Sequence, residues 1–186
     1  MKHGKMTEQF GLWLKKHLET NKKYSVFYDH GSPLEDPSVV VIKGFYGDKV
    51  TNRNRLADVD VMVANTDQEV VLLIEIEESE MSPKKLLGDI FSTVMCNKFA
   101  VRPENENEYF GVSPKTVLII AGVVPNQGDQ EEELDKIRNI IMPRLQKFST
   151  PKGSLQIDNI KIVTDKDILK TLEKLEKEVT SFFAMS

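Results

Sequence analysis

Four acidic residues fall close together near the middle of the chain, on two neighbouring segments that alternate acidic and apolar residues. Asp58 and Asp60 belong to the first segment, and Glu75 and Glu77 belong to the second. Successive side chains of a β-strand point to opposite faces, so the two acids of each segment share one face. Clustered carboxylates are the oxygen ligands that Mg²⁺ and Mn²⁺ take, together with water and phosphate oxygens. The pattern therefore predicts a divalent-metal site.

The two acidic segments, residues 57–64 and 70–77, are predicted to form a β-hairpin. A four-residue loop, 66–69, would place Asp60 opposite Glu75 and Asp58 opposite Glu77. Like charges that face each other destabilise a sheet, and burial of such charges raises their pKa or requires a cation. A bound metal ion explains this pairing best. In the alternative, the register differs by one or two residues and the acids point past the end of the sheet into solvent.

The elements that must position these acids follow from the apolar periodicity. The fold class predicted is α/β, with a mixed central sheet flanked by helices on both faces. The whole chain, 1–186, is expected to form one domain, with a core of about 7–124 and a C-terminal elaboration of about 125–186. The predicted elements are a helix over 7–21, strands over 24–28 and 39–45, the hairpin, a helix over 82–98, a strand over 116–124, a helix over 131–148 that Pro143 should kink, a strand over 157–163 and a last helix after Asp167.

Composition narrows the class of protein further. The chain has 186 residues and a net charge of -4, and its one cysteine, Cys96, excludes an internal disulfide and fits a reducing, cytoplasmic setting. No apolar run approaches the roughly 20 residues that span a bilayer, so no membrane partner is expected. Residues 1–56 carry a net charge of +4 and the remainder carries -8. The acidic total therefore does not exclude a nucleic-acid partner.

The spacing of the acids resembles that of a known family. Asp60, fourteen further residues and then Glu75-Ile76-Glu77 on an adjoining strand, followed by a helix, are similar to the motif of the PD-(D/E)XK nuclease superfamily. The resemblance implies a restriction-endonuclease-like core of helix, three-strand meander, helix and strand over residues 7–124. It also implies hydrolysis of phosphodiester bonds with Mg²⁺ or Mn²⁺, with DNA as the expected partner and RNA as the less favoured one.

The resemblance assigns metal ligands residue by residue. Asp60 matches the aspartate of the first hairpin strand, with Asp58 as the competing candidate, and Glu75 matches the acid of the (D/E)XK element. A glutamate of the first helix often joins them in the family. Here Glu8 is the better match and Glu19 the weaker one.

Position 77 departs from the family pattern, because it holds Glu77 where the motif has lysine. In the family that lysine orients or activates the attacking water. Some members carry glutamate there, or supply the lysine from the following helix, which here begins with Lys84 and Lys85. If the protein is active, Glu77 would be a third metal ligand or a general base, and Lys84 or Lys85 would neutralise charge in the transition state. Solvated surface charge is the alternative interpretation of the lysine pair.

The basic first third of the chain supplies the candidate phosphate contacts, which are Arg53, Arg55, Lys15 and Lys16. Two other functions stay open at this point. One is a catalytically inactive protein of the same fold that binds nucleic acid or regulates a partner, and the other is an unrelated α/β domain whose last helix docks to a partner. A homodimer is compatible with the sequence.

Overall fold

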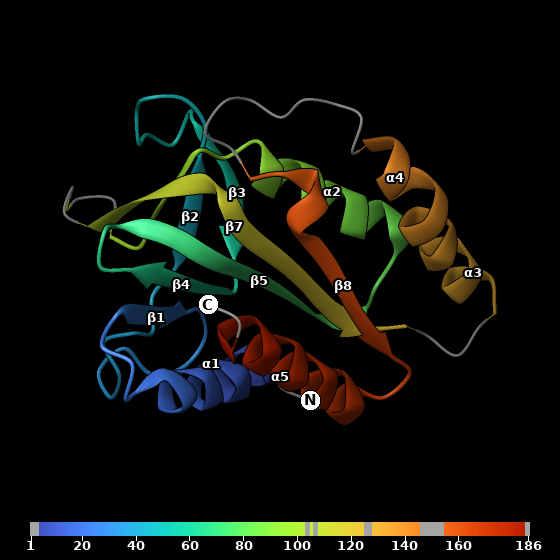
Figure 1. Ribbon diagram of the computed structural model, residues 1–186, viewed down its shortest axis with the longest axis horizontal. Coiled ribbons are helices and arrows are strands. Elements are labelled where there is room, and N and C mark those ends of the chain that lie inside the picture. Colours follow the sequence, from blue (N-terminus) through green and yellow to red (C-terminus); the bar gives the residue numbers. More distant parts are fainter. Residues whose placement is uncertain (1–3, 103–104, 106–107, 125–127, 146–154, 185–186) are drawn as a thin grey trace.

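Eight strands form one mixed sheet, and helices cover both of its faces (Figure 1). The computed structural model describes residues 4–102, 105, 108–124, 128–145 and 155–184. The predicted α/β class is confirmed. None of the helices in these ranges is long and apolar enough to cross a membrane.

The described residues form fifteen helices and strands, which are named here in chain order. They are α1 (Lys5–Leu18), β1 (Tyr24–Tyr28), β2 (Ile42–Phe45), β3 (Arg55–Val59), β4 (Val61–Asn65), β5 (Glu69–Glu80), α2 (Pro83–Val94), β6 (Lys98–Ala100), β7 (Tyr109–Val123), α3 (Gly128–Lys136), the π-helix η2 (Ile137–Ile141), α4 (Met142–Leu145), the 3-10 helix η3 (Ile157–Asn159), β8 (Ile160–Asp165) and α5 (Ile168–Ala184).

The centre of the sheet is an antiparallel meander joined to a parallel pair. β1 pairs with β4, β4 pairs with β5, and β5 runs parallel to β7 after a connection through α2 and β6. β8 adds a further parallel strand beside β7. β2 and β3 lie between β1 and β4 in the sequence, but they pair on the other side of the sheet, where β6 joins them to β7. The C-terminal end of β5 therefore lies beside β7 and leads directly into α2.

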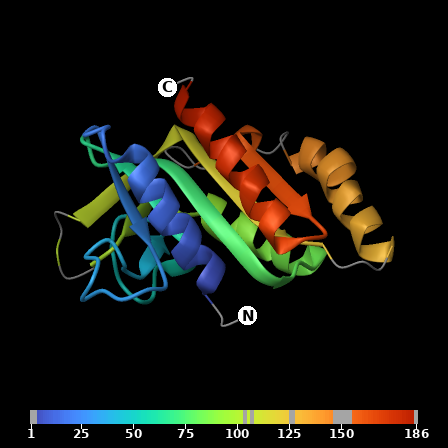
Figure 2. The same cartoon turned by 90° about the horizontal axis from the view of Figure 1, so that it is seen from below.

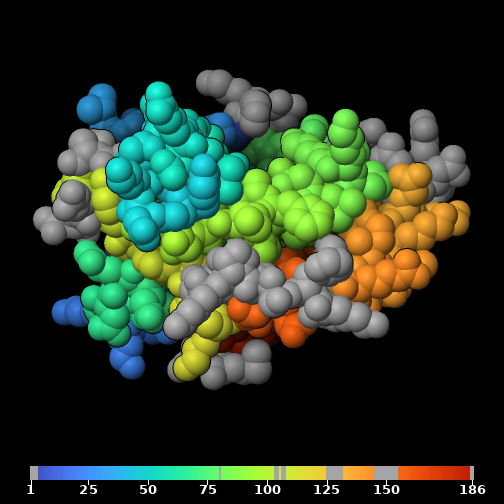
Figure 3. All heavy atoms as spheres, turned by 90° about the horizontal axis from the view of Figure 1, so that it is seen from above, coloured from blue at the N-terminus to red at the C-terminus, as the bar shows by residue number. Residues whose placement is uncertain are grey.

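Two apolar clusters hold the helices on the sheet. On one face, α1 and α5 lie side by side (Figure 2), and their buried residues pack against the sheet. On the other face, α2 lies between the segment before β3 and the helices α3 and α4 (Figure 3). The first cluster includes Phe10, Leu14, Ile74, Leu175 and Val179, and the second includes Met62, Leu73, Leu86, Ile90, Ile120 and Leu134.

The predicted hairpin register is confirmed over its central residues. Val61 pairs with Ile74 and Met62 with Leu73, so the next position in the register sets Asp60 opposite Glu75. The first predicted strand, 57–64, is however two strands. The chain turns at Asp60, whose carbonyl accepts a hydrogen bond from the Asp29 amide at 2.8 Å.

This break separates Asp58 from the hairpin. β3 pairs with β2, so that Asp58 lies opposite Lys43 and not opposite Glu77. The predicted pairing of Asp58 with Glu77 is therefore wrong. The physical reason is that the backbone groups of β3 and β4 are satisfied by different partner strands on either side of Asp60.

Two helices also differ from their predicted bounds. α2 ends at Val94 and not near residue 98. The helix expected over 131–148 begins at Gly128 and contains the π-helix η2 just before Pro143, a residue whose missing N–H disturbs the helical hydrogen bonds. Residues 146–148 lie outside the described ranges.

The first helix is capped by a residue that is distant in the sequence. Glu78, at the end of β5, accepts hydrogen bonds from the backbone N–H groups of Gly4, Met6 and Thr7 at 2.8, 2.7 and 3.2 Å. The N–H groups of a first helical turn lack intrahelical partners and favour an anion. Glu78 therefore fastens α1 to the sheet beside the acidic segment.

We expect the Glu78→Gln substitution to destabilise the protein by about 1–2 kcal/mol, because the amide keeps one acceptor oxygen and loses the charge that strengthens these bonds. Urea unfolding followed by circular dichroism measures this change. The exposed Glu35→Gln serves as the control and should leave the free energy of unfolding within about 0.5 kcal/mol of the wild type. Equal stabilities of the two variants would show that Glu78 does not fasten α1.

Candidate active site

A pocket of about 430 Å³ lies where the C-terminal end of β5 meets α2. Loops and strand ends at the carboxyl edge of parallel strands are the usual place for ligands in α/β sheets. Five of the nine lining residues are acidic and one is a lysine. The lining consists of Asp60, Glu75, Ile76, Glu77, Glu78, Ser79, Lys85, Asp89 and Ile120.

Asp60 is held at the pocket by the break between β3 and β4. Its Oδ2 accepts a hydrogen bond from the Ile76 N–H at 2.6 Å, which ties it to the neighbouring strand. Burial raises the pKa of Asp60 to about 6, and the negative charges of Asp29 and Glu78 act in the same direction. The Ile76 hydrogen bond and the charge of His30 oppose this rise without cancelling it. Asp60 is thus a carboxylate whose charge the protein alone compensates poorly.

Glu75 lies inside the sheet, between β4 and β7, where its backbone is paired with Ile120. Burial raises the pKa of Glu75 well above its ordinary value, and the charge of Asp60 is the next cause, followed by that of Asp89. Lys85 is the cation that opposes these effects. Of the two acids that the resemblance assigns to the metal, Asp60 is therefore close enough to disfavour the ionisation of Glu75.

Glu77 and Lys85 form an ion pair across the pocket. Burial alone would raise the pKa of Glu77, but hydrogen bonds from Lys85 and Ser79 outweigh it and hold that pKa below its ordinary value. α2 presents Lys85 from its first turn, which starts at Pro83 after Ser82 has capped the helix by accepting the Lys85 N–H at 3.3 Å. The helix thus delivers a lysine to the place where the strand has glutamate.

Gly122 of β7 leaves room for this arrangement. It is paired with Glu77, and a Cβ atom on it would lie 3.1 Å from the Glu77 Cβ and 2.3 Å from the Met81 Cε. A side chain at position 122 would clash with Met81 and displace the end of β5 that carries Glu77.

Asp89 is a pocket residue that the sequence reasoning missed. It lies on α2 one turn after Lys85, and burial raises its pKa, with Lys85 opposing this shift and Glu77 adding to it. The signal was present in the sequence, because residues four apart on a helix share a face. Glu78 and Ser79 were also missed, although they follow Glu77 directly on the same strand.

The donor set of the pocket fits a hard divalent cation. Mg²⁺ binds through one or two carboxylates and keeps several waters, and Asp60 and Glu75 would supply those two. Their raised pKa values mark an unmet need for positive charge. In the part of the chain that the structure describes, no group of three or more His, Cys, Asp or Glu side chains is arranged to hold a metal ion. Water and substrate oxygens would therefore complete the coordination.

The other predicted ligands lie outside this pocket. Asp58 forms an ion pair with Arg55, and its side chain is 49% exposed. Glu8 lies near Gly31, where a Cβ atom would be 3.7 Å from Glu8 Oε1. The structure therefore places Asp60, and not Asp58, beside Glu75.

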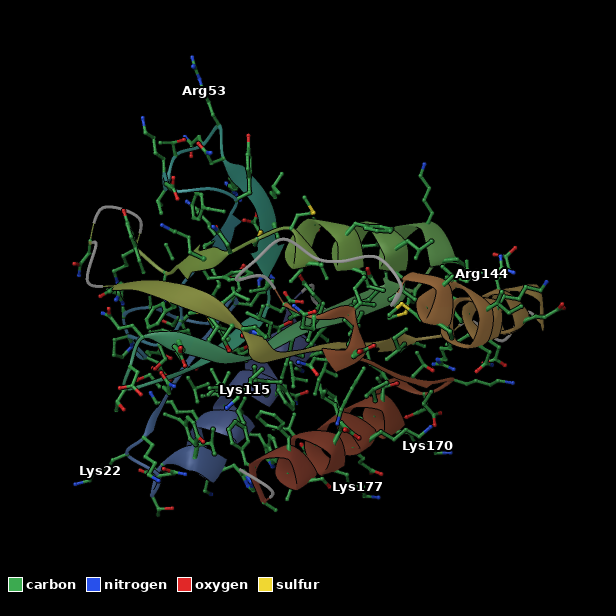
Figure 4. The ribbon with its side chains drawn as sticks, turned by 45° about the horizontal axis from the view of Figure 1, so that its top comes forward. Lys22, Arg53, Lys115, Arg144, Lys170 and Lys177 are labelled. Carbon is green, nitrogen blue, oxygen red and sulfur yellow. The ribbon has the colours of Figure 1, made fainter. Side chains whose placement is uncertain are left out.

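The predicted basic residues separate into different parts of the molecule. Lys84 is exposed and does not line the pocket, whereas its neighbour Lys85 does. Arg53 extends from the loop before β3 away from the body of the protein (Figure 4). Lys15 and Lys16 line a second groove, over β1. These residues do not converge on the pocket with Lys85.

Comparison of the chain with protein-family models, with curated proteins and with solved structures gives no match.

The raised pKa of Asp60 predicts that this residue destabilises the metal-free protein at neutral pH. The folded state holds the Asp60 proton more tightly than the unfolded state, so stability falls as the pH rises from about 4 to about 6. Replacement by Asn keeps an acceptor for the Ile76 amide and removes the charge. We expect Asp60→Asn to gain up to about 3 kcal/mol at pH 8 in EDTA, and less at pH 4.5.

Urea unfolding at the two pH values measures this gain, and Asp58→Asn, on the exposed side of the break, is the matched control. A variant at position 60 that is less stable than the wild type at pH 8 would contradict the buried, uncompensated charge.

Proposed function

We propose that the protein is a metal-dependent nuclease that hydrolyses phosphodiester bonds in DNA, with a core of the restriction-endonuclease-like type. The observation that carries the proposal is the meeting of Asp60, Glu75, Glu77 and Lys85 in one pocket. The order α1, β1, β4, β5, α2 and β7, with an antiparallel meander followed by a parallel strand, supports the same family resemblance.

Lys85 takes the place of the lysine that the family motif has at position 77. The motif lysine is replaced by Glu77, but Lys85 reaches the same pocket from the first turn of α2 and pairs with Glu77. A lysine supplied from the helix would neutralise charge on the phosphate in the transition state. Glu77, kept ionised by its neighbours, holds the ammonium group in the pocket.

In this proposal, Asp60 and Glu75 hold a divalent ion, which supplies Lewis-acid activation of the phosphate and of a bound water. Asp89 would be the proton acceptor in preference to Glu77, because burial raises the pKa of Asp89 whereas hydrogen bonds lower that of Glu77. Ser79 keeps Glu77 in position by donating a hydrogen bond to it through its backbone N–H at 3.0 Å.

A second candidate function is a non-catalytic module of the same fold that binds nucleic acid or regulates a partner. The observation in its favour is the ion pair itself, because Lys85 is already neutralised by Glu77 before any phosphate is present. Such a module would bind an oligonucleotide and leave it intact.

Cleavage of supercoiled plasmid and of labelled single-stranded DNA and RNA, with Mg²⁺ or Mn²⁺, separates the two functions. We expect wild-type protein to cut DNA and Glu75→Gln to lose at least about 100-fold in rate. Lys85→Met should lose about 100-fold as well, since it removes a charge from the transition state. Lys84→Met, one residue earlier on the same helix, should stay within about twofold of the wild type.

Wild-type protein that cuts none of these substrates with either metal would favour the non-catalytic module. Equal losses for Lys84→Met and Lys85→Met would contradict the assignment of the lysine.

A further inference from the structure

A second hollow of about 770 Å³ lies over β1, and we call it the β1 groove. One wall is the last part of α1 and the turn after it, the other wall is the segment 36–38 with Arg102, and the floor is β1. It shares no lining residue with the acidic pocket. Its lining consists of Leu12, Lys15, Lys16, Leu18, Glu19, Asn21, Lys22, Tyr24, Ser25, Val26, Phe27, Asp36, Pro37, Ser38 and Arg102.

β1 is an edge strand whose outer side is only partly covered. At its end, the Tyr28 N–H donates to the Ser38 carbonyl at 3.0 Å, and the Tyr28 carbonyl accepts from the Val40 N–H at 2.9 Å. The Tyr28 backbone therefore points away from β4. Because this direction alternates along an antiparallel pair, the backbone N–H and carbonyl of Val26 point the same way, into the β1 groove.

No hydrogen bond found within the described ranges reaches the Val26 backbone from the groove side. The segment 38–40 stops covering the edge at Tyr28, and the open stretch begins directly beside it. Unpaired strand edges bind further strands, so this edge is a template for an extended chain.

The charges around the β1 groove favour an acidic occupant. Four lining residues are basic and two are acidic. Of the four bases, Lys15 is paired with Asp36 and Arg102 with Glu108, which leaves Lys16 and Lys22. The Asp36 carboxylate is already occupied, because it accepts from the Lys15 Nζ at 2.6 Å, the Tyr28 hydroxyl at 2.9 Å and the Ser38 N–H at 2.8 Å. Lys16 on α1 and Lys22 on the turn after it line the groove beside one carboxylate, that of Glu19. Lys22 extends outward from the protein (Figure 4).

A peptide fits this groove better than a nucleic-acid strand does. Single-stranded nucleic acid is usually bound by aromatic rings that stack on its bases. The two rings on the floor are already packed, Tyr24 against Phe183 at 5.1 Å and Phe27 against Phe110 at 5.3 Å between centroids. The open backbone of Val26 offers a donor and an acceptor, and a peptide strand uses both, whereas the phosphates of DNA accept from the N–H but have no donor for the carbonyl.

We propose that the β1 groove binds an extended acidic peptide, which adds to the edge of β1 beside Val26 while its carboxylates contact Lys16 and Lys22. This interaction does not depend on catalysis in the acidic pocket, because it uses no residue of that pocket. It competes with the prediction that Lys15 and Lys16 contact phosphates.

Fluorescence anisotropy with three labelled probes at pH 7.5 in EDTA tests the proposal. The probes are an eight-residue peptide of alternating Glu and Thr, its counterpart of alternating Lys and Thr, and a twelve-nucleotide oligothymidylate. We expect the acidic peptide to bind and the basic peptide not to bind. The paired substitution of Lys16→Glu with Lys22→Glu should weaken acidic-peptide binding at least tenfold, whereas Lys170→Glu with Lys177→Glu on α5 should change it less than twofold.

Val26→Pro separates strand addition from simple charge attraction, because proline removes the outward N–H and leaves the neighbouring hydrogen bonds to β4 in place. It should also weaken the acidic peptide at least tenfold, with circular dichroism showing that the variant is folded. If that variant does not fold, hydrogen exchange of the peptide bound to the wild-type protein replaces it as the test. Peptide amides that are not protected from exchange at alternate positions would overturn strand addition.

Acidic-peptide binding that is unchanged in a folded Val26→Pro variant would overturn the proposal. Binding of the oligonucleotide in place of the peptide would overturn it too, as would the absence of binding by all three probes at 1 mM protein, a concentration at which a dissociation constant near 1 mM is detectable. None of these outcomes bears on cleavage, which the acidic pocket alone would perform.

Discussion

The burial of two neighbouring carboxylates is the constraint on which the rest of the site depends. Asp60 lies directly before β4 and Glu75 lies on the neighbouring β5; burial raises the pKa of each, and the charge of Asp60 raises the pKa of Glu75 further. An isolated buried charge is among the costliest features a fold can carry, unless it is protonated or paired. A hydrogen bond from the Ile76 N–H lowers the pKa of Asp60, and the charge of Lys85 lowers that of Glu75, but neither cancels the effect of burial.

One strand end serves the site and the fold at once. The alternation along β5 sends Glu75 and Glu77 toward α2, whereas Glu78 turns toward the first turn of α1 and holds it. α2 returns Lys85 to the same strand end through the ion pair with Glu77. The two helices on opposite faces of the sheet are therefore both fixed by consecutive acidic residues, which couples the shape of the pocket to the docking of α1.

Much of this arrangement follows from local patterns. The hairpin with a four-residue loop predicted the pairing of Val61 with Ile74, and with it the approach of Asp60 to Glu75. The structure keeps this register from Val61 to Val63, and a shift in register follows at Ala64. The Ser-Pro start of α2 placed Lys85 on a first turn. The α/β class followed from the order of strands and helices.

The rest depended on long-range pairing, which no local pattern reports. The break at Asp60 arises because β3 pairs with β2 and β4 with β1, so the placement of Asp58 could not be read from a continuous apolar run. The cap of α1 by Glu78 joins residues more than 70 positions apart in the sequence. Asp89 is different, because its position four residues after Lys85 on the same helix is a local signal.

Calorimetric titration of the metal-free protein with Mn²⁺ at pH 7.5 tests the central claim most directly. The account predicts one site that is lost in Glu75→Gln and in Asp60→Asn and kept in Asp58→Asn, with weaker binding at pH 5, where Asp60 and Glu75 hold protons that the ion must displace. Binding that survives in Glu75→Gln, or no binding by the wild-type protein, would contradict the claim that these two carboxylates are built for a cation.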